Sequence, residues 1–468
     1  MDREKIGKGH FFPKEINRRE FVRLSGLATG LLLTIGRGTF FPFDTKAAEN
    51  NHIALPIFEH YGDQQIRLDF PGEWKIQEAR MKAHDFPPLT PQQIKEAFNN
   101  PIGIKPLQEL AQGKKRVVIT VDDLERPTPA YAILPLLLEE LNQAGIKNEQ
   151  ISCIGSFGNH DPMTQDQVIR KIGIETARKI PFFNHNCWDN FVELGKTSQG
   201  TPLKINKEFM AADLKISIQG FRWHEIAGFG GGGKAVLPGV ASIESTEHNH
   251  LEIGFPNRKP NPAAGPCKVK NNPIRKDMDE AAKLAGLDMC LVVFPNGRRE
   301  VIGLIACDPV TGWREACKKG YALHLTQEIK SADIVVANAY PQCAQPQTSL
   351  PLLNQSVREG GTAVLVMQHP DGMRQIHYLA RQWGKDYGGH LWMPPNPERA
   401  LVPAASRLII FTNLGTKNDQ LNFPHKQVEF MYAWPDVLAR LKKYHKEASV
   451  AVYPYAPLQI PTSLTLDI

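Results

Sequence analysis

The chain alternates short, continuous apolar runs with longer segments whose apolar residues recur every three or four positions. The runs "RVVITVDD" (116–123), "QISCIGSFG" (150–158) and "DLKISIQG" (213–220) have the length and β-branched content of buried strands. Between them, "YAILPLLLEELNQAG" (131–145) has helical periodicity and ends at a glycine. Buried strands that alternate with amphipathic helices predict parallel sheets and an α/β fold.

The second half of the chain repeats this alternation. Strands are predicted at "CLVVFP" (290–295), "VIGLIA" (301–306), "ADIVVANAYP" (332–341), "TAVLVMQ" (362–368), "RLIIFT" (407–412) and "SVAVYP" (449–454). Helices are predicted over 311–330 and 427–445. We therefore expect two α/β domains with a cleft between them, the C-terminal one doubly wound and Rossmann-like. The expected divisions are a first domain over 48–320, a second over 321–455 and a tail over 456–468.

The first 47 residues have the layout of an export signal. The pair Arg18-Arg19 is followed by an apolar run over 24–35 and by small residues at 47–48. This order is typical of a twin-arginine signal, and the run is shorter than the ~20 residues of a membrane-spanning helix. The alternative is an amphipathic helix with a chance arginine pair. We expect an exported protein, periplasmic or extracellular, that uses the twin-arginine export machinery and has no stable membrane span in the mature chain.

Composition excludes some classes of partner. The formal net charge is +6, but residues 1–47 hold nine Lys/Arg and five Asp/Glu, which leaves +2 for the remainder. Residues 48–468 are close to neutral and have no basic stripe interleaved with aromatic residues, so there is no reason to expect a nucleic-acid partner. The seven cysteines form no C-x-x-C pair, and we expect most of them to be small buried apolar residues.

The glycine-rich stretch "AGFGGGGKAVLPG" (227–239) is the most informative one. Gly228, Gly233 and Lys234 match a phosphate-binding loop, but Ala235 stands where a Ser or Thr would bind magnesium. Seven residues also separate the loop from the preceding strand, so a nucleoside triphosphatase is disfavoured. Five glycines within six positions predict that the backbone approaches a ligand closely. The alternative is a glycine-rich turn with a solvated lysine.

Three histidines accompany this loop. His160 follows the second predicted strand in "GNHDPMT" (158–164), and His224 and His250 flank the glycines. Because the carboxyl ends of parallel strands meet at one edge of a sheet, we expect the three to share a cleft. Two imidazoles that face one substrate can exchange donor and acceptor roles, and a neutral imidazole is also a common nickel or zinc ligand. Each histidine taken singly also fits a structural role, and His248 is a second candidate ligand.

Four segments together carry a resemblance. "VDDLERPTP" (121–129), "GNHDPMT" (158–164), "HEIAGFGGGGKAVLPG" (224–239) and Asn249-His250 occur in the order and nearly the spacing of the lactate racemase family, which uses a nickel-pincer nucleotide. The resemblance covers most of residues 50–320 and, more loosely, the second domain. It implies a racemase or epimerase of a 2-hydroxy acid, with 48–320 as the cofactor-binding and catalytic domain and with cofactor-biosynthesis enzymes as partners.

The resemblance also implies roles for single residues. Lys234 would join the cofactor covalently, and His250 would coordinate its nickel. His160 and His224 would be the general acid and base on either side of the substrate. By the same resemblance, Asp123 and Arg126, with Asp122 as the alternative register, would help to hold the cofactor. The backbone of Gly230, Gly231 and Gly232 would approach the nucleotide.

The chain departs from this family pattern at several positions. Gly230 and Gly233 stand where Ser and Arg are common, Asp161 where Arg is usual, and Glu125 where Thr is usual. In the second domain, Pro351 stands where we expect a lysine that contacts substrate. The predicted site thus holds fewer cations than the family pattern, which argues against simple lactate as the substrate.

A larger hydroxy acid is therefore expected, either a sugar acid or an aromatic one near Trp223. Gln342, Gln345 and Gln347 either supply neutral hydrogen bonds to it or are exposed loop residues. Two other functions remain open: a hydrolase that binds zinc or nickel directly through its histidines, and a non-catalytic cofactor-binding protein. The metal ligands of that hydrolase would be His160, His224 and His250.

Overall fold

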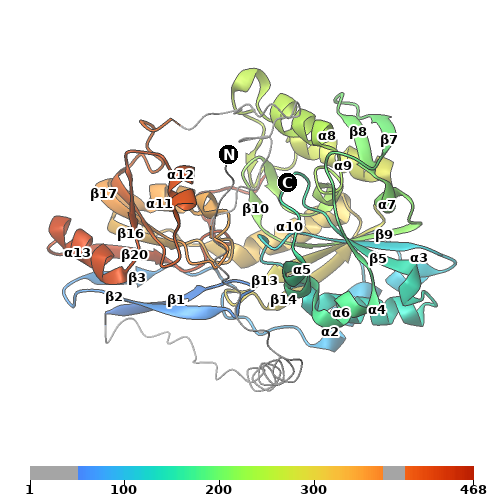
Figure 1. The fold of residues 1–468 in the computed structure, drawn as a ribbon, viewed down its shortest axis with the longest axis horizontal. Helices are drawn as coiled ribbons and strands as arrows, with labels where there is room; N and C mark the ends of the chain where they lie inside the picture. The colour runs from blue at the N-terminus through green and yellow to red at the C-terminus, as the bar shows by residue number, and fades with distance from the viewer. Residues whose placement is uncertain (1–50, 373–395) are drawn as a thin grey trace, which may run out of the picture. The chain divides into compact units, whose positions relative to one another are not determined.

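The structure is a computed structural model that describes residues 51–372 and 396–468 (Figure 1). These residues belong to one compact unit, Asn50–Ile468. The predicted export signal over 1–47 lies outside the described residues. Among the helices that the structure describes, none combines the length and the apolar character needed to cross a membrane.

The first large sheet has the strand order β14-β13-β9-β4-β5-β6. The bounds are β14 (Val301–Cys307), β13 (Met289–Pro295), β9 (Leu214–Gly220), β4 (Val117–Val121), β5 (Ile151–Gly155) and β6 (Phe182–Asn184). All neighbours pair in parallel except β13 and β14, which pair antiparallel. Every residue of β4, β5, β9 and β13 is buried, as expected for strands covered on both faces.

Helices cover the two faces of this sheet in separate hydrophobic clusters. One face packs against α2 (Pro91–Asn99), α3 (Leu107–Ala111), α4 (Ala130–Gln143) and α5 (Gln165–Ile172), with α6 (Ile174–Lys179) beside them. The other face packs against α9 (Pro273–Ala285) and α10 (Thr311–His324). The glycine-rich stretch lies within the cluster of the second face.

The second large sheet has the order β19-β18-β17-β16-β20-β3, and all its neighbours pair in parallel. The bounds are β19 (Val428–Met431), β18 (Ala405–Phe411), β17 (Val357–Val366), β16 (Ala332–Asn338), β20 (Ser449–Tyr453) and β3 (Lys75–Glu78). Its helices are α11 (Leu350–Ser356), α12 (Lys417–Asn422) and α13 (Trp434–Tyr444). The parallel α/β architecture expected from the sequence is therefore confirmed.

The beginning of the described chain packs with this second sheet, although the expected division placed it in the first domain. β3 pairs with β20, and the hairpin of β1 (His52–Ile57) and β2 (Gln64–Asp69) shares a hydrophobic cluster with strands of the same sheet. In Figure 1 these blue strands lie beside the orange and red elements. A strand pairs with whichever sheet edge is open to it, so neighbours in sequence need not share a sheet.

The segment 427–445 also differs from expectation, because its first residues form strand β19 and the helix α13 begins only at Trp434. Polar and apolar residues alternate from Gln427 to Phe430, which is the period of a strand. Pro435 lies in the first turn of α13, where its missing N–H costs nothing. Similarly, the helix predicted over 311–330 ends at His324.

Short elements complete the chain. Two small sheets have two strands each: β7 (Phe191–Lys196) with β8 (Pro202–Asn206), and β15 (Leu325–Thr326) with β21 (Ile460–Pro461). A third has three strands, β10 (Trp223–His224), β11 (Ala227–Phe229) and β12 (Gly265–Pro266). The helical pieces are α7 (Lys207–Met210), α8 (Ile243–Glu247), η1 (Asn148–Gln150), η2 (Gly232–Ala235), η3 (His248–Ile253), η4 (Pro256–Arg258) and η5 (Pro346–Ser349). All seven cysteines are described; each is free, and each is buried, as was expected for most of them.

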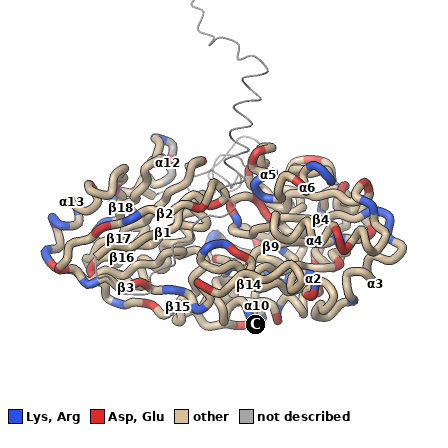
Figure 2. Tube along the Cα trace, turned by 90° about the horizontal axis from the view of Figure 1, so that it is seen from below, with Lys and Arg blue, Asp and Glu red and all other residues tan. Residues whose placement is uncertain are grey.

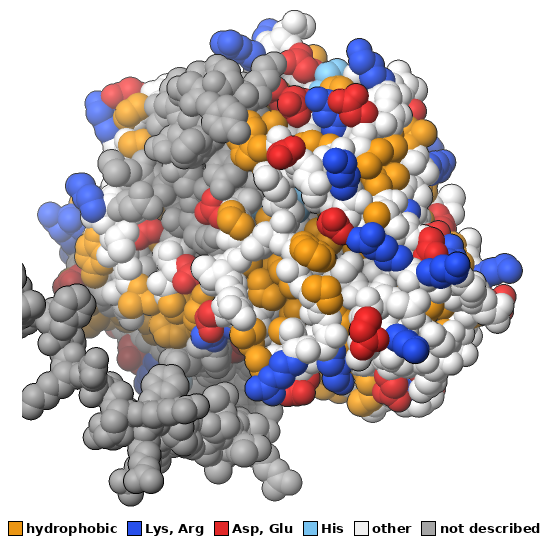
Figure 3. Space-filling view, turned by 45° about the vertical axis from the view of Figure 1, so that its right-hand side comes forward, with side chains coloured by type: hydrophobic (Ala, Val, Ile, Leu, Met, Phe, Trp, Pro, Cys, Tyr) orange, Lys and Arg blue, Asp and Glu red, His pale blue; other side chains and the backbone are white. Residues whose placement is uncertain are grey.

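Charged residues of both signs are interspersed along the described trace (Figure 2). On the face drawn in Figure 3, hydrophobic side chains likewise lie scattered among charged and other polar ones. This distribution agrees with the near-neutral body expected from composition.

The packing of the N-terminal segment on the second sheet yields a stability prediction. Trp434 is buried against Phe70 and Phe411, and its indole N–H donates to the carbonyl of Asp69 over 2.8 Å. Trp434→Ala should lower the free energy of unfolding by about 3–5 kcal/mol, measured by urea denaturation. Leu414→Ala, at an exposed position, serves as the control and should change it by less than about 0.5 kcal/mol. An equal effect of both variants would contradict this packing.

Candidate active site

One cavity of about 310 Å³ lies at the carboxyl ends of β4, β5 and β9. The loop that follows β16 in the second sheet also lines it, through Gln345, Gln347 and Thr348. Eight of the nine residues selected from the sequence line this cavity: Asp123, Arg126, His160, His224, Gly230, Gly231, Lys234 and His250. The expectation that these segments share a cleft is therefore met.

The ninth residue, Gly232, does not line the cavity. Its φ is +62°, and a Cβ there would lie 2.9 Å from the carbonyl oxygen of Pro309 and from the ring of Trp313. At Gly228 and Gly233 a Cβ would lie 2.3 Å from backbone oxygens of neighbouring segments. These three glycines are required by the protein's own packing, which corrects the expectation that the whole run serves a ligand.

Two residues that the sequence analysis missed hold the glycine loop. Arg275 of α9 donates hydrogen bonds to the carbonyl oxygens of Ala227 and Gly231, at 3.1 and 3.0 Å, and its guanidinium stacks 4.0 Å from the centre of the Trp313 ring. The indole N–H of Trp313 in turn donates to the carbonyl of Gly230 over 3.1 Å. Both residues come from distant helices, so no local pattern identified them.

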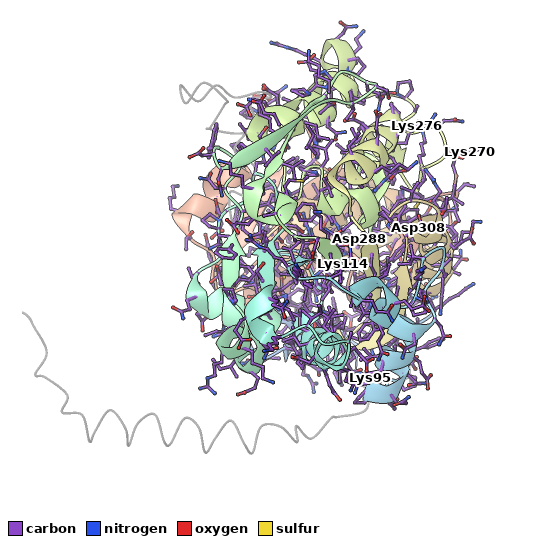
Figure 4. All side chains as sticks on the ribbon, turned by 90° about the vertical axis from the view of Figure 1, so that its right-hand side faces the viewer. Lys95, Lys114, Lys270, Lys276, Asp288 and Asp308 are labelled. Atoms are coloured by element: carbon purple, nitrogen blue, oxygen red, sulfur yellow. The ribbon has the colours of Figure 1, made fainter. Side chains whose placement is uncertain are left out.

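Asp308 fixes the start of α10, the helix that carries Trp313. Its carboxylate accepts hydrogen bonds from the backbone N–H groups of Thr311 and Gly312, at 2.8 and 2.6 Å. Figure 4 labels Asp308, together with Lys276 on α9. Capping of this kind satisfies donors at the helix N-terminus that have no intrahelical partner.

Lys234 points its amine into the cavity without a partner. Within residues 51–372 and 396–468, its Nζ forms no hydrogen bond and no ion pair. Burial, together with Arg126 and Arg275 nearby, holds the pKa of this amine well below its usual range. A neutral amine is nucleophilic, so this lysine is suited to form a covalent bond.

His160 is paired with Asp123. Its Nδ1 lies 2.6 Å from the Asp123 carboxylate and 3.7 Å from Glu125. Burial opposes ionisation of Asp123, but Arg126 and His160 outweigh this effect and hold its pKa below the usual range. Since a carboxylate accepts a hydrogen bond, Nδ1 of the neutral ring carries the proton and Nε2 is left as an acceptor.

The alternative register at Asp122 is resolved by its contacts. Asp122 binds the buried Lys171 amine at 2.6 Å and accepts a hydrogen bond from the backbone of Gly220 at 3.1 Å. Asp123, by contrast, contacts both His160 and Arg126. The aspartate of the D-x-x-R motif that faces this histidine is therefore Asp123.

His224 has the opposite arrangement of ring nitrogens. Its Nδ1 accepts hydrogen bonds from the backbone N–H groups of Ile226 and Ala227, at 3.3 and 3.2 Å. The proton of the neutral ring therefore resides on Nε2, which is a donor. Burial, with Lys234 and Arg222 nearby, holds the pKa of His224 well below its usual range.

His250 lies on η3, a π-helical turn, which is a rare conformation found frequently at functional sites. Burial, with Lys234 and His160 nearby, lowers its pKa to about 3, so the ring is neutral at ordinary pH. A neutral imidazole is the form that binds metals. His248 is instead 2.8 Å from the hydroxyl of Thr201 and does not line the cavity.

The three histidines do not converge on one point. Among the described residues, the ligand atoms of Asp123, Glu125 and His160 lie within 4.8 Å of one another, and no other group of three His, Cys, Asp or Glu residues does so. The geometry therefore gives no support to a metal bound directly through His160, His224 and His250.

The second sheet contributes glutamines that hold arginines. Gln342 accepts a hydrogen bond from Arg222 over 2.7 Å, and Gln345 accepts one from Arg126 over 2.5 Å. Both glutamines are buried, so the interpretation as exposed loop residues is wrong for them. Trp223 is buried in the hydrophobic core and does not line the cavity, which removes the reason to expect an aromatic substrate there.

Comparison with known proteins finds similarity to lactate racemases. The family of the lactate racemase N-terminal domain matches residues 61–260. Lactate racemase from Thermoanaerobacterium thermosaccharolyticum is 30% identical over 321 residues, which span 67% of this chain and 74% of that protein. Lactate racemase from Lactiplantibacillus plantarum is 32% identical over 289 residues, spanning 60% of this chain and 66% of that protein.

Solved structures share the fold. The lactate racemase apoprotein from T. thermosaccharolyticum superposes with a TM-score of 0.66 at 23% identity, over 88% of this chain and 99% of that one. A crystal structure of a Thermotoga maritima protein superposes with a TM-score of 0.59 at 18% identity, over 80% and 99%.

The packing of the glycine loop yields a second prediction. Gly232→Ala should lower the free energy of unfolding by about 1–3 kcal/mol, because the new methyl group meets Trp313 and φ is in the left-handed region. The free energy of unfolding of Gly230→Ala should stay within about 1 kcal/mol of that of the unsubstituted protein, since its Cβ would approach nothing closer than 3.4 Å. Chemical denaturation of the two variants side by side measures the difference. The reverse ranking would refute the assigned packing.

Proposed function

The chain belongs to the lactate racemase family, and on that premise we propose that it is a racemase or epimerase of a 2-hydroxy acid. The observation that carries the proposal is the meeting of His160, His224, Lys234 and His250 at one cavity. Inversion at C2 of such an acid requires proton acceptors and donors on both sides of one carbon, which two separate imidazoles supply.

We propose that a nickel-pincer nucleotide is the cofactor, because the residues present fit it. The Lys234 amine has a lowered pKa and no partner among the described residues, so it is available for covalent attachment. The neutral His250 ring at the same cavity is a suitable nickel ligand. Arg126 places positive charge at the cavity, where it can attract an anionic nucleotide. When bound, this cofactor supplies the acceptor and donor of the C2 hydride.

The hydrogen bonds at Nδ1 of His160 and His224 suggest which imidazole accepts a proton and which donates one. Nε2 of His160 accepts the proton of the substrate hydroxyl, and the Asp123 carboxylate on Nδ1 stabilises the cation that forms. His224 presents an N–H at Nε2, because its Nδ1 is occupied by two backbone donors. His160 is thus the base and His224 the donor in one direction, and the roles exchange in the other.

Export and assembly complete the proposal. If residues 1–47 are a twin-arginine signal, as predicted, the cofactor is built and attached inside the cell before export. The cofactor-biosynthesis enzymes, the export machinery and a periplasmic or extracellular location stay predictions.

Covalent attachment is tested by intact-mass measurement under denaturing conditions, on protein produced together with the cofactor-biosynthesis enzymes. The unsubstituted protein should carry an adduct of several hundred daltons, since a tethered nucleotide survives denaturation and a bare metal does not. Lys234→Ala should lack the adduct, whereas Lys318→Ala, at an exposed lysine, should keep it. His250→Asn should keep the adduct but lose most of the nickel. An unmodified Lys234 in the loaded protein would overturn the cofactor assignment.

Proton transfer is tested by kinetics across pH with a panel of 2-hydroxy acids. Burial lowers the pKa of His160 below 6.5, so the neutral base persists above that pH and kcat/KM should fall only as pH drops through the lowered pKa. His160→Asn and His224→Asn should each reduce kcat by about 10²–10⁴-fold while the adduct stays intact.

The Asp123 carboxylate raises the pKa of His160, so Asp123→Asn should move the acid limb to lower pH and also slow turnover. Glu175→Gln, at an exposed carboxylate that does not line the cavity, is the matched control and should leave the profile unchanged. Full adduct without turnover of any acid in the panel would favour a non-catalytic cofactor-binding protein.

A further inference from the structure

Arg222 is a buried cation without a carboxylate partner. It lies between β9 and β10, is 7% exposed and lines the cavity. Among the described residues, no carboxylate oxygen lies within 4.0 Å of its guanidinium, and its one hydrogen-bond acceptor is the neutral amide of Gln342. Arg126, the other arginine of the cavity, has Asp123 at 4.0 Å.

No direct ion pair therefore neutralises Arg222; Glu225, which also lines the cavity, and Asp123 and Asp122 act on its charge only from beyond 4.0 Å. Burial and the neighbouring Arg126 lower its pKa to about 9, which still leaves the guanidinium charged at neutral pH. A buried charge without a counter-ion is unfavourable, and an anion that enters the cavity relieves that cost. The remaining N–H donors of the planar group match the two oxygens of a carboxylate.

The position of Arg222 suits a substrate contact. It is two residues from His224, and the short strand β10 carries that histidine to the same cavity. Gln342, from the loop after β16, holds NH1 at 2.7 Å and thereby orients the guanidinium. Pro351 stands where a lysine was expected, so that position supplies no cation to the cavity.

We propose that Arg222 binds the carboxylate of the 2-hydroxy acid and that Gln342 is its positioning residue. This assignment rests on the proposed racemase function and adds a specificity-determining residue to it. Arg222 thereby supplies from the first sheet the positive charge that the second sheet lacks at Pro351.

The test measures binding of 2-hydroxyisobutyrate, which has the carboxylate and hydroxyl of a substrate but no hydrogen at C2 to transfer. Isothermal titration calorimetry on loaded and unloaded full-length protein should give a Kd that rises by about 10–100-fold in Arg222→Met, because a charged hydrogen bond is lost. The Kd of Arg222→Lys should lie between those of the unsubstituted protein and Arg222→Met. Gln342→Met should weaken binding by a few-fold, with the change in KM larger than the change in kcat.

Intact mass, nickel content and thermal unfolding of each variant accompany the titrations. The proposal requires that Arg222→Met keep its adduct and its fold, and that Arg178→Met, an exposed arginine, behave like the unsubstituted protein. Loss of the adduct in Arg222→Met, with retention in Arg222→Lys and Arg178→Met, would assign Arg222 to the nucleotide and overturn the proposal. Unchanged binding by Arg222→Met, or no binding by the unsubstituted protein in either form, would also overturn it. Absence of the adduct from the unsubstituted protein would instead count against the proposed cofactor. The titrations on protein without cofactor would still test whether Arg222 binds the carboxylate.

Discussion

The site depends on one buried guanidinium. Arg275 donates hydrogen bonds to the carbonyl oxygens of Ala227, Phe229 and Gly231, and it stacks on Trp313, which holds Gly230. Without these donors the carbonyl groups of the loop would be buried without partners, at a cost of about 1–3 kcal/mol each. Because α9 and α10 supply the donors, two helices on one face of the sheet determine where the backbone of the loop lies, and therefore where Lys234 points.

That arrangement concentrates positive charge at a single cavity. Arg126 and Arg222 disfavour the charged form of Lys234, Arg126 acts in the same way on Arg222, and burial acts in the same direction on the histidines. The outcome is an amine and imidazoles with lowered pKa values beside guanidinium groups that stay charged at neutral pH. Such a set can form a covalent bond and bind a metal through uncharged nitrogen, while it attracts anions. Asp123 is the exception: it keeps its charge because His160 and Arg126 flank it.

The second sheet acts on the site through neutral groups. Gln342 and Gln345 orient Arg222 and Arg126 without neutralising them, which a carboxylate at either position would do. The positive charge therefore stays available to a ligand, and the contribution of the second sheet is geometric. The same loop follows β16, whose position in the sheet also depends on β20, the strand that pairs with the N-terminal β3.

The sequence by itself determined most strands of the two large sheets, the parallel α/β class and the set of polar residues that meet at the cavity. Strand-length apolar runs leave few alternatives, and parallel strands bring their carboxyl ends to one edge, so His160, Asp123 and Lys234 could be grouped in advance. Tertiary structure alone decided that Gly232 packs on Trp313, that Asp122 pairs with Lys171, and that residues 75–78 join the far sheet. It also revealed Arg275 and Arg222. Those outcomes depend on contacts between residues far apart in the chain, and local periodicity carries no information about which distant side chain will be the partner.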